Sequence, residues 1–111
     1  MSIPVPLPEL AGTMARFGSA SYLLTVGPDA TPHAASVTVE WSEGCLLVGA
    51  GRRTAANIRA NEALALLWPP SSPGDYTLIV DGTGSVREEG PHLVVVIKPT
   101  SAVLHVTARR P

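Results

Sequence analysis

Two adjacent arginines, Arg52 and Arg53, follow a glycine turn and precede a segment rich in alanine. The residues before Gly51 are apolar and strand-like, and those from Thr54 onward favour a helix. A helix N-terminus offers free backbone N–H groups and the positive end of the helix dipole, and glycines let a ligand approach the backbone. Guanidinium groups add charge-assisted hydrogen bonds. Residues 51–57 therefore have the composition of a phosphate-binding turn.

Two other interpretations of this turn start from the same residues. It also fits an ordinary strand-to-helix turn with two solvated arginines, since most such turns are structural. A Rossmann dinucleotide site is suggested because Gly49 and Gly51 stand between a strand and a helix. Its third glycine would fall at Thr54, and the expected helix is too short for a parallel crossover. We therefore set the dinucleotide site aside and keep the phosphate turn and the plain turn.

The composition favours one domain that hides part of its apolar surface. The chain has 111 residues, and we expect a single domain over 1–111. Charged residues make up 15% of it, below the ~25% of an ordinary soluble protein. A homodimer would hide the extra apolar surface that this shortfall predicts. The formal net charge of −1 lacks the basic excess that binding to nucleic acid needs, so nucleic acid is not an expected partner.

Cysteine and histidine usage limits the chemistry further. Cys45 is the only cysteine, which excludes an intrachain disulfide framework and a thiolate zinc cluster. The three histidines show no metal-ligand spacing, so we expect no metal. The chain begins without a basic and then apolar segment, and no apolar run approaches the ~18 residues of a membrane span. These features predict a soluble, cytoplasmic protein that does not contact membranes.

Two short helices are expected. Prolines keep residues 1–8 extended, and apolar residues at helical spacing predict a helix over 9–17 that ends at Gly18. The alanine-rich residues 54–60 form the second helix, and residues 108–111 are left as a tail.

Strand patterns fill most of the remaining sequence. The runs 45–49 and 63–68 are apolar enough to be covered on both faces, and Asp81 and Gly82 mark a bulge. Seven short strands joined by tight turns predict a mainly β chain that forms a closed or nearly closed antiparallel barrel. The expected strands are 21–26, 34–41, 45–49, 63–68, 76–86, 93–98 and 102–107.

The sequence Gly51-Arg-Arg-Thr-Ala-Ala-Asn-Ile-Arg-Ala-Asn-Glu-Ala-Leu-Ala-Leu-Leu-Trp-Pro-Pro70 carries a family resemblance. It resembles the pyridoxamine 5'-phosphate oxidase-like split-barrel segment that begins Gly-Ser-Arg-Lys, continues through a helix to an Asn-Pro pair and ends in an apolar strand. The N-terminal helix, residues 23–26, the turn before His33 and residues 78–84 follow in the family's order. The resemblance therefore covers nearly the whole chain and implies a split β-barrel of the FMN-binding type.

The resemblance also implies a cofactor site, with FMN in a groove between the two subunits of a homodimer. The flavin would contact the strand 35–39, and the phosphate clamp would fall on Arg53 and Thr54. Basic residues that the oxidases place at Ala35, Glu40 and Thr54 are missing here. The implied cofactor-binding residues are Ser36, Val37, Thr38, Val39, Val48, Gly49, Arg52, Arg53, Thr54, Asn57 and Thr77.

The implied function is that of a flavoprotein oxidoreductase that transfers hydride between flavin and a small organic substrate. Oxidation of pyridoxamine phosphate is not expected, because the oxidases bind their substrate through an arginine-rich segment that has no counterpart after Thr107. No catalytic residue is identified, although Tyr22 could donate a proton. Three alternatives stay open: a reductase using 8-hydroxy-5-deazaflavin, a non-catalytic flavin- or haem-binding or carrier module, and a partner-binding barrel with an empty groove.

Overall fold

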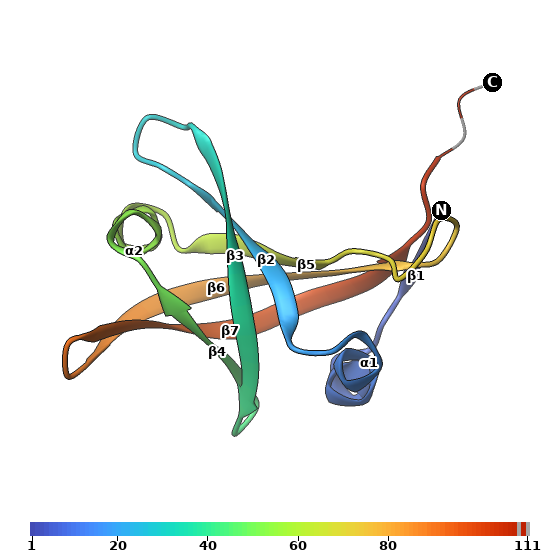
Figure 1. The fold of residues 1–111 in the computed structure, drawn as a ribbon, viewed down its shortest axis with the longest axis horizontal. Coiled ribbons are helices and arrows are strands. Elements are labelled where there is room, and N and C mark those ends of the chain that lie inside the picture. The colour runs from blue at the N-terminus through green and yellow to red at the C-terminus, as the bar shows by residue number, and fades with distance from the viewer. Residues whose placement is uncertain (109, 111) are drawn as a thin grey trace.

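A closed antiparallel barrel forms the body of the molecule in the computed structural model, which describes residues 1–108 and 110 (Figure 1). Its strands follow one another in the order β7-β4-β3-β2-β5-β6, and pairing of β6 with β7 closes the circle. A further strand, β1 (Ser2–Pro4), lies outside the barrel against β7. The six barrel strands are β2 (Ala20–Val26), β3 (Pro32–Ser42), β4 (Cys45–Ala50), β5 (Ala63–Trp68), β6 (Thr77–Glu89) and β7 (His92–His105). The prediction of a mainly β barrel is confirmed.

The core fills the barrel because side chains alternate along each strand. In β5, for example, Leu64, Leu66 and Trp68 are buried while the residues between them are only half-buried. Trp68 also donates a hydrogen bond from its indole N–H to the Gly18 carbonyl, at 2.9 Å, which ties β5 to the end of the first helix. A buried indole that finds such a partner satisfies its single polar group.

Two helices stand apart on the barrel (Figure 1). The first, α1 (Leu10–Phe17), follows a short 3₁₀ turn, η1 (Leu7–Glu9), and ends at Gly18, whose φ of 87° suits glycine. The second is α2 (Arg52–Ala60). In the described residues, neither helix is long and apolar enough to cross a membrane.

Helix α2 is held on the barrel by apolar packing and one buried amide. Ala55 and Ile58 are buried, and Ile58 belongs to the main core cluster. Asn57 is also buried and donates from Nδ2 to the Thr25 hydroxyl of β2 at 3.1 Å. Because a buried amide without a partner would cost free energy, this bond helps to fix where α2 sits.

The predicted strands 93–98 and 102–107 are one strand, β7. The predicted bulge at Asp81 and Gly82 is confirmed, and it explains why the sequence suggested two strands where there is one. Asp81 pairs with Ser101 but Gly82 pairs with Pro99, so Thr100 is an extra residue without a partner across the ladder. Proline lacks an N–H donor and is tolerated in a strand at such a bulge, so Pro99 does not end the strand.

Several boundaries also differ from the sequence predictions. The N-terminal segment pairs as β1 instead of being merely extended, and η1 already begins at Leu7. Helix α2 begins at Arg52, two residues before the predicted start, because Gly51 has extended torsions and acts as its N-cap. Strand β3 begins at Pro32, so that His33 lies inside a strand. Positions 109 and 111 of the predicted tail lie outside the described residues.

The two strands that were expected to be covered on both faces are covered on one. In β4, Leu46 and Val48 are buried but Cys45 and Leu47 are only half-buried. In β5, Ala63 is exposed and the residues between the buried ones are half-buried. A single chain thus leaves apolar side chains on the outside of the barrel.

Replacing Gly82 by alanine should destabilise the barrel at the bulge. A Cβ there would lie 2.6 Å from the Lys98 carbonyl oxygen and 3.1 Å from an Ile97 methyl group, so the backbone would have to move. We expect Gly82→Ala to lower the free energy of unfolding by about 1–3 kcal/mol in urea denaturation. The matched control is Gly12→Ala in α1, where a Cβ would meet nothing within 4 Å and where alanine should stabilise the helix slightly. Equal effects of the two changes would contradict this account.

The Asn57 bond should show as coupling in a double-mutant cycle. Asn57→Ala leaves the Thr25 hydroxyl without its donor, and we expect it to cost about 1–3 kcal/mol of unfolding free energy. Thr25→Val removes the acceptor, and the double variant should be about 1 kcal/mol more stable than additive effects predict. Unfolding would be followed by circular dichroism in urea. Simple additivity would show that this bond does not hold α2.

Candidate anion site at the start of α2

Strands β3 and β4 separate at Val39. From Pro32 to Thr38, β3 pairs with β2, whereas its pairing with β4 begins only at Val39, opposite Val48. Beyond that point β4 runs on to Ala50 and enters α2, and Figure 1 shows the two strands spreading apart toward this helix. The edge of β3 over 32–38 therefore has no strand beside it on the β4 side, and the barrel is split here.

The N-terminus of α2 has no compensating group within the helix itself. No side chain caps it and its first turn contains no acidic residue. Gly51 accepts a hydrogen bond from the Ala55 N–H at 3.0 Å, and the N–H groups before Ala55 have no partner within the helix. The side chains of Arg52 and Arg53 are exposed at this point. Two guanidinium groups and the positive end of the helix dipole therefore face solvent together.

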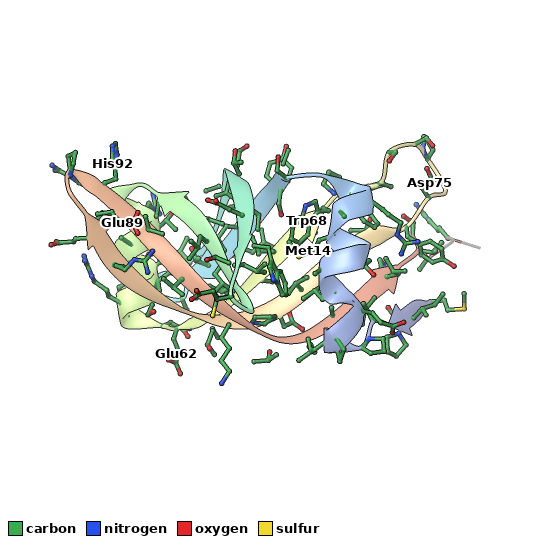
Figure 2. All side chains as sticks on the ribbon, turned by 90° about the horizontal axis from the view of Figure 1, so that it is seen from below. Met14, Glu62, Trp68, Asp75, Glu89 and His92 are labelled. Carbon is green, nitrogen blue, oxygen red and sulfur yellow. The ribbon has the colours of Figure 1, made fainter. Side chains whose placement is uncertain are left out.

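A cleft of 350 Å³ adjoins this turn, between the end of β4 and the start of β7. It is lined among others by Gly49, Gly51, Arg52 and His92. A Cβ built at either glycine would meet nothing within 4 Å, so there is open space where a side chain would stand. We call Gly49, Gly51, Arg52, Arg53 and this cleft the turn site. Figure 2 shows His92 and Glu89 together at this end of the molecule.

Arg52 and Arg53 lie in the turn site, and the other nine predicted cofactor residues fall into three groups. Ser36 and Thr38 are exposed on the outer face of β3, and Gly49 is exposed where β4 ends. Gly49 lines the cleft of the turn site, whereas no residue of β3 lines it. The second group has buried side chains, which keeps these side chains from a ligand on the outer face: Val37, Val39 and Val48 in the barrel core, and Thr54 and Asn57 on α2.

Thr77 forms the third group by itself. It begins β6 opposite His105, whereas Ala50 of the turn pairs with Leu93 at the other end of β7. Twelve strand residues at ~3.3 Å each separate these ends by roughly 40 Å. One chain therefore does not bring Thr77 to the turn site.

The β2–β3 turn places the carboxylate of Asp29 within the field of Arg53. Asp29 accepts two hydrogen bonds from Thr31, from the N–H at 3.1 Å and from the hydroxyl at 2.8 Å. The hydroxyl bond first and the N–H bond next hold the pKa of Asp29 below its ordinary value, and the positive charge of Arg53 adds to this effect. Asp29 therefore offsets part of the positive charge of the turn site. Asp29 was not among the residues predicted for this site, although Asp-x-Thr is typical of a turn closed by its own side chain.

Tyr22 of β2 is a second exposed polar group whose position the sequence did not predict. A tyrosine on a barrel strand usually packs in the core, but 46% of Tyr22 is exposed and its partner across the ladder is Ser36. Two hydroxyl groups thus share the outer face of β2 and β3. Within the part of the chain that the structure describes, no three His, Cys, Asp or Glu side chains gather as a metal site.

Comparison of sequences gives a short match only. No family model matches the chain. Over 58 residues it is 40% identical to uncharacterized proteins of Mycobacterium bovis and Mycobacterium tuberculosis. The match covers 50% of this chain and 41% of each relative, so the chain spans less than half the length of these proteins.

Comparison of structures gives matches over most of the chain. A candidate pyridoxamine 5'-phosphate oxidase from Listeria innocua has a TM-score of 0.73 and 20% identity over 89% of this chain and 98% of its own. A FAD-binding protein from Mesorhizobium loti has a TM-score of 0.72 and 13% identity over 94% and 96%. An F420 reductase has a TM-score of 0.63 and 21% identity over 75% and 87%. The chain therefore has the split-barrel fold that the pyridoxamine 5'-phosphate oxidase-like proteins share.

Proposed function

We propose that this protein binds a flavin-type cofactor at the turn site. The observation that carries the proposal is the uncapped N-terminus of α2 with Arg52 and Arg53 beside it, at the place where β3 and β4 separate. Two structures of the same fold are of a FAD-binding protein and an F420 reductase, which supports a cofactor of this class. Helix N-termini with adjacent guanidinium groups are suited to phosphate.

The turn site and the outer face of β3 would together hold the two halves of such a cofactor. Arg52, Arg53 and the free N–H groups of α2 would hold its phosphate. The exposed hydroxyls of Ser36 and Thr38 and the open space beside Gly49 would accept its ring system along the outer face of β3. Val37, Val39, Val48, Thr54 and Asn57 would offer only their backbone, because their side chains are buried.

FMN is the first candidate. Its phosphate is compact, and the basic residues of α2 are confined to Arg52 and Arg53 in the first turn and Arg59 in the last. An 8-hydroxy-5-deazaflavin coenzyme is the alternative, but its longer anionic tail would favour a more extended basic patch. Either ring is compatible with the small and apolar residues around Gly49.

The proposed activity is transfer of hydride between the cofactor and a small organic substrate. A bound flavin would supply the hydride chemistry, while the protein orients the ring and limits access of water. The exposed Tyr22 hydroxyl, across from Ser36, is the candidate proton donor on this face. A carrier or a haem- or flavin-binding module without turnover is the alternative, and it would show no substrate-dependent reoxidation of the reduced cofactor.

We further propose a homodimer that uses the outer face of β5, β2 and β3. Residues 63–68, 20–26 and 32–38 contain no Asp, Glu, Lys or Arg, although these three strands are neighbours in the barrel. A groove of 470 Å³ runs over them, and its lining includes Leu24, Val26 and Ala65. An uncharged face with an apolar groove is typical of a subunit contact. The face borders the open edge of β3, so a partner there would help to enclose the cofactor.

A cytoplasmic location is part of the proposal. Cys45 is a free, half-buried thiol in the described part of the chain. A reducing compartment keeps such thiols from pairing between chains. Fractionation of cells that express the protein would test the location.

Removing Arg53 should weaken FMN far more than riboflavin, because only FMN carries the phosphate. We expect Arg53→Ala to cost about 2 kcal/mol of FMN binding free energy, the value of a charge-assisted contact, with little change for riboflavin. Flavin fluorescence titration of the purified protein gives both affinities.

The matched control for this test is Arg59→Ala, which removes an equal charge from the last turn of the same helix. It should leave the ratio of FMN to riboflavin affinity unchanged. Equal loss of both ligands in Arg53→Ala would show that Arg53 does not hold the phosphate. If neither FMN nor a deazaflavin coenzyme binds the wild type below ~100 μM, the cofactor proposal fails.

A charge on the proposed contact face should separate the subunits. Leu24→Glu places a carboxylate in the apolar groove, and we expect the dimer to become monomeric in sedimentation velocity without loss of β structure. Flavin affinity should fall in parallel, because the partner would no longer enclose the ring. Lys98→Glu changes an exposed residue of β7 and should leave the dimer intact. A wild type that is monomeric at 100 μM, roughly the upper working range of the method, would overturn the dimer.

A further inference from the structure

A second cleft, of 450 Å³, lies at the other end of the molecule from the turn site. Its walls are the C-terminal turn of α1, the β5–β6 connection and the end of β7. Figure 2 shows Asp75 on that connection, on the far side of α1 from His92 and Glu89. The six lining residues are Arg16, Phe17, Ser71, Asp75, Tyr76 and Leu104. Ligand pockets typically combine this volume with apolar walls and a few polar groups.

The walls of this cleft carry aromatic and aliphatic surface. Phe17, Tyr76 and Leu104 are each half-buried, so part of each side chain remains accessible from the cleft. Phe17 and Leu104 pack against the main core from the other side, which keeps them in place. Two aromatic rings and an aliphatic side chain in one cleft are suited to a planar apolar group.

The cleft also carries one charge of each sign. Arg16 lies in the last turn of α1 and Asp75 in the β5–β6 connection. Arg16 and Asp75 do not form a salt bridge with each other. The salt bridge found among the described residues joins Arg87 and Glu89. Asp75 is held by Ser72, which donates from its hydroxyl to one carboxylate oxygen at 2.7 Å. The Asp75 N–H also donates to the Ser72 carbonyl at 3.1 Å, so the connection fixes where the carboxylate stands.

We propose that this cleft is a binding site for a small aromatic zwitterion, in the class of an aromatic amino acid. Its carboxylate contacts Arg16, its ammonium group contacts Asp75, and its ring lies against Phe17, Tyr76 and Leu104. Each charge of the ligand thus meets a protein charge that forms no salt bridge among the residues the structure describes, which selects against ligands with only one of the two groups. The site is built from one chain and does not depend on the cofactor.

Three probes separate the two charge contacts: L-phenylalanine, 3-phenylpropionate, which lacks the ammonium group, and phenethylamine, which lacks the carboxylate. Binding is followed by chemical-shift changes in the full-length protein, which should centre on Phe17, Tyr76 and Leu104. We expect L-phenylalanine to bind with a Kd below about 1 mM and each of the other probes about fivefold more weakly.

Two variants should change these affinities in a crossed pattern. Arg16→Gln should weaken L-phenylalanine and 3-phenylpropionate about fivefold and leave phenethylamine unchanged. Asp75→Asn should weaken L-phenylalanine and phenethylamine and leave 3-phenylpropionate unchanged. The control variants Arg59→Gln and Asp29→Asn remove one charge of each sign near α2 and should change none of the three affinities.

A damaged fold cannot produce the crossed pattern, because it would weaken all three probes alike. Uniform weakening in either variant would overturn the proposed charge contacts. Absence of shift changes around the cleft up to about 10 mM probe would overturn the site itself. Both results leave the proposed flavin site untouched, since FMN titration tests that site separately.

Discussion

The separation of β3 from β4 at Val39 is the constraint on which the turn site depends. Were the two strands paired along their full length, β4 would have no room to turn into α2, and the edge of β3 over 32–38 would be closed by backbone hydrogen bonds. The Asn57 bond to Thr25 and the buried Ile58 fix α2 against the barrel instead. The start of the helix is thereby held beside an open strand edge.

This arrangement concentrates positive charge without a large net charge on the chain. The formal net charge is −1, yet two guanidinium groups and an uncapped helix N-terminus meet at one place. Asp29 stands near Arg53 and moderates the local field. The second cleft lies at the opposite end and carries one charge of each sign, so the two ends of the barrel are suited to ligands of different charge.

Part of the fold could be read from alternation and turn residues. Val37 and Val39 alternate with polar residues, and their burial in the core follows from that pattern. The continuity of β7 could not be read in this way, because Pro99 resembles a strand end in sequence. Only the ladder to β6 shows that a bulge accommodates it, with Gly82 leaving room for the Lys98 carbonyl.

The sequence by itself determined the barrel class, the two helices and the glycine-arginine turn, because these features depend on local propensity and on the period of apolar residues. Tertiary structure alone decided which predicted residues can meet. The tertiary structure buries the side chains of Val48 and Asn57 and places Thr77 at the end of β6 that is distant from the turn site. It also exposes Tyr22 opposite Ser36. The physical reason is that strand pairing and burial set the direction of each side chain, and both depend on partners distant in sequence.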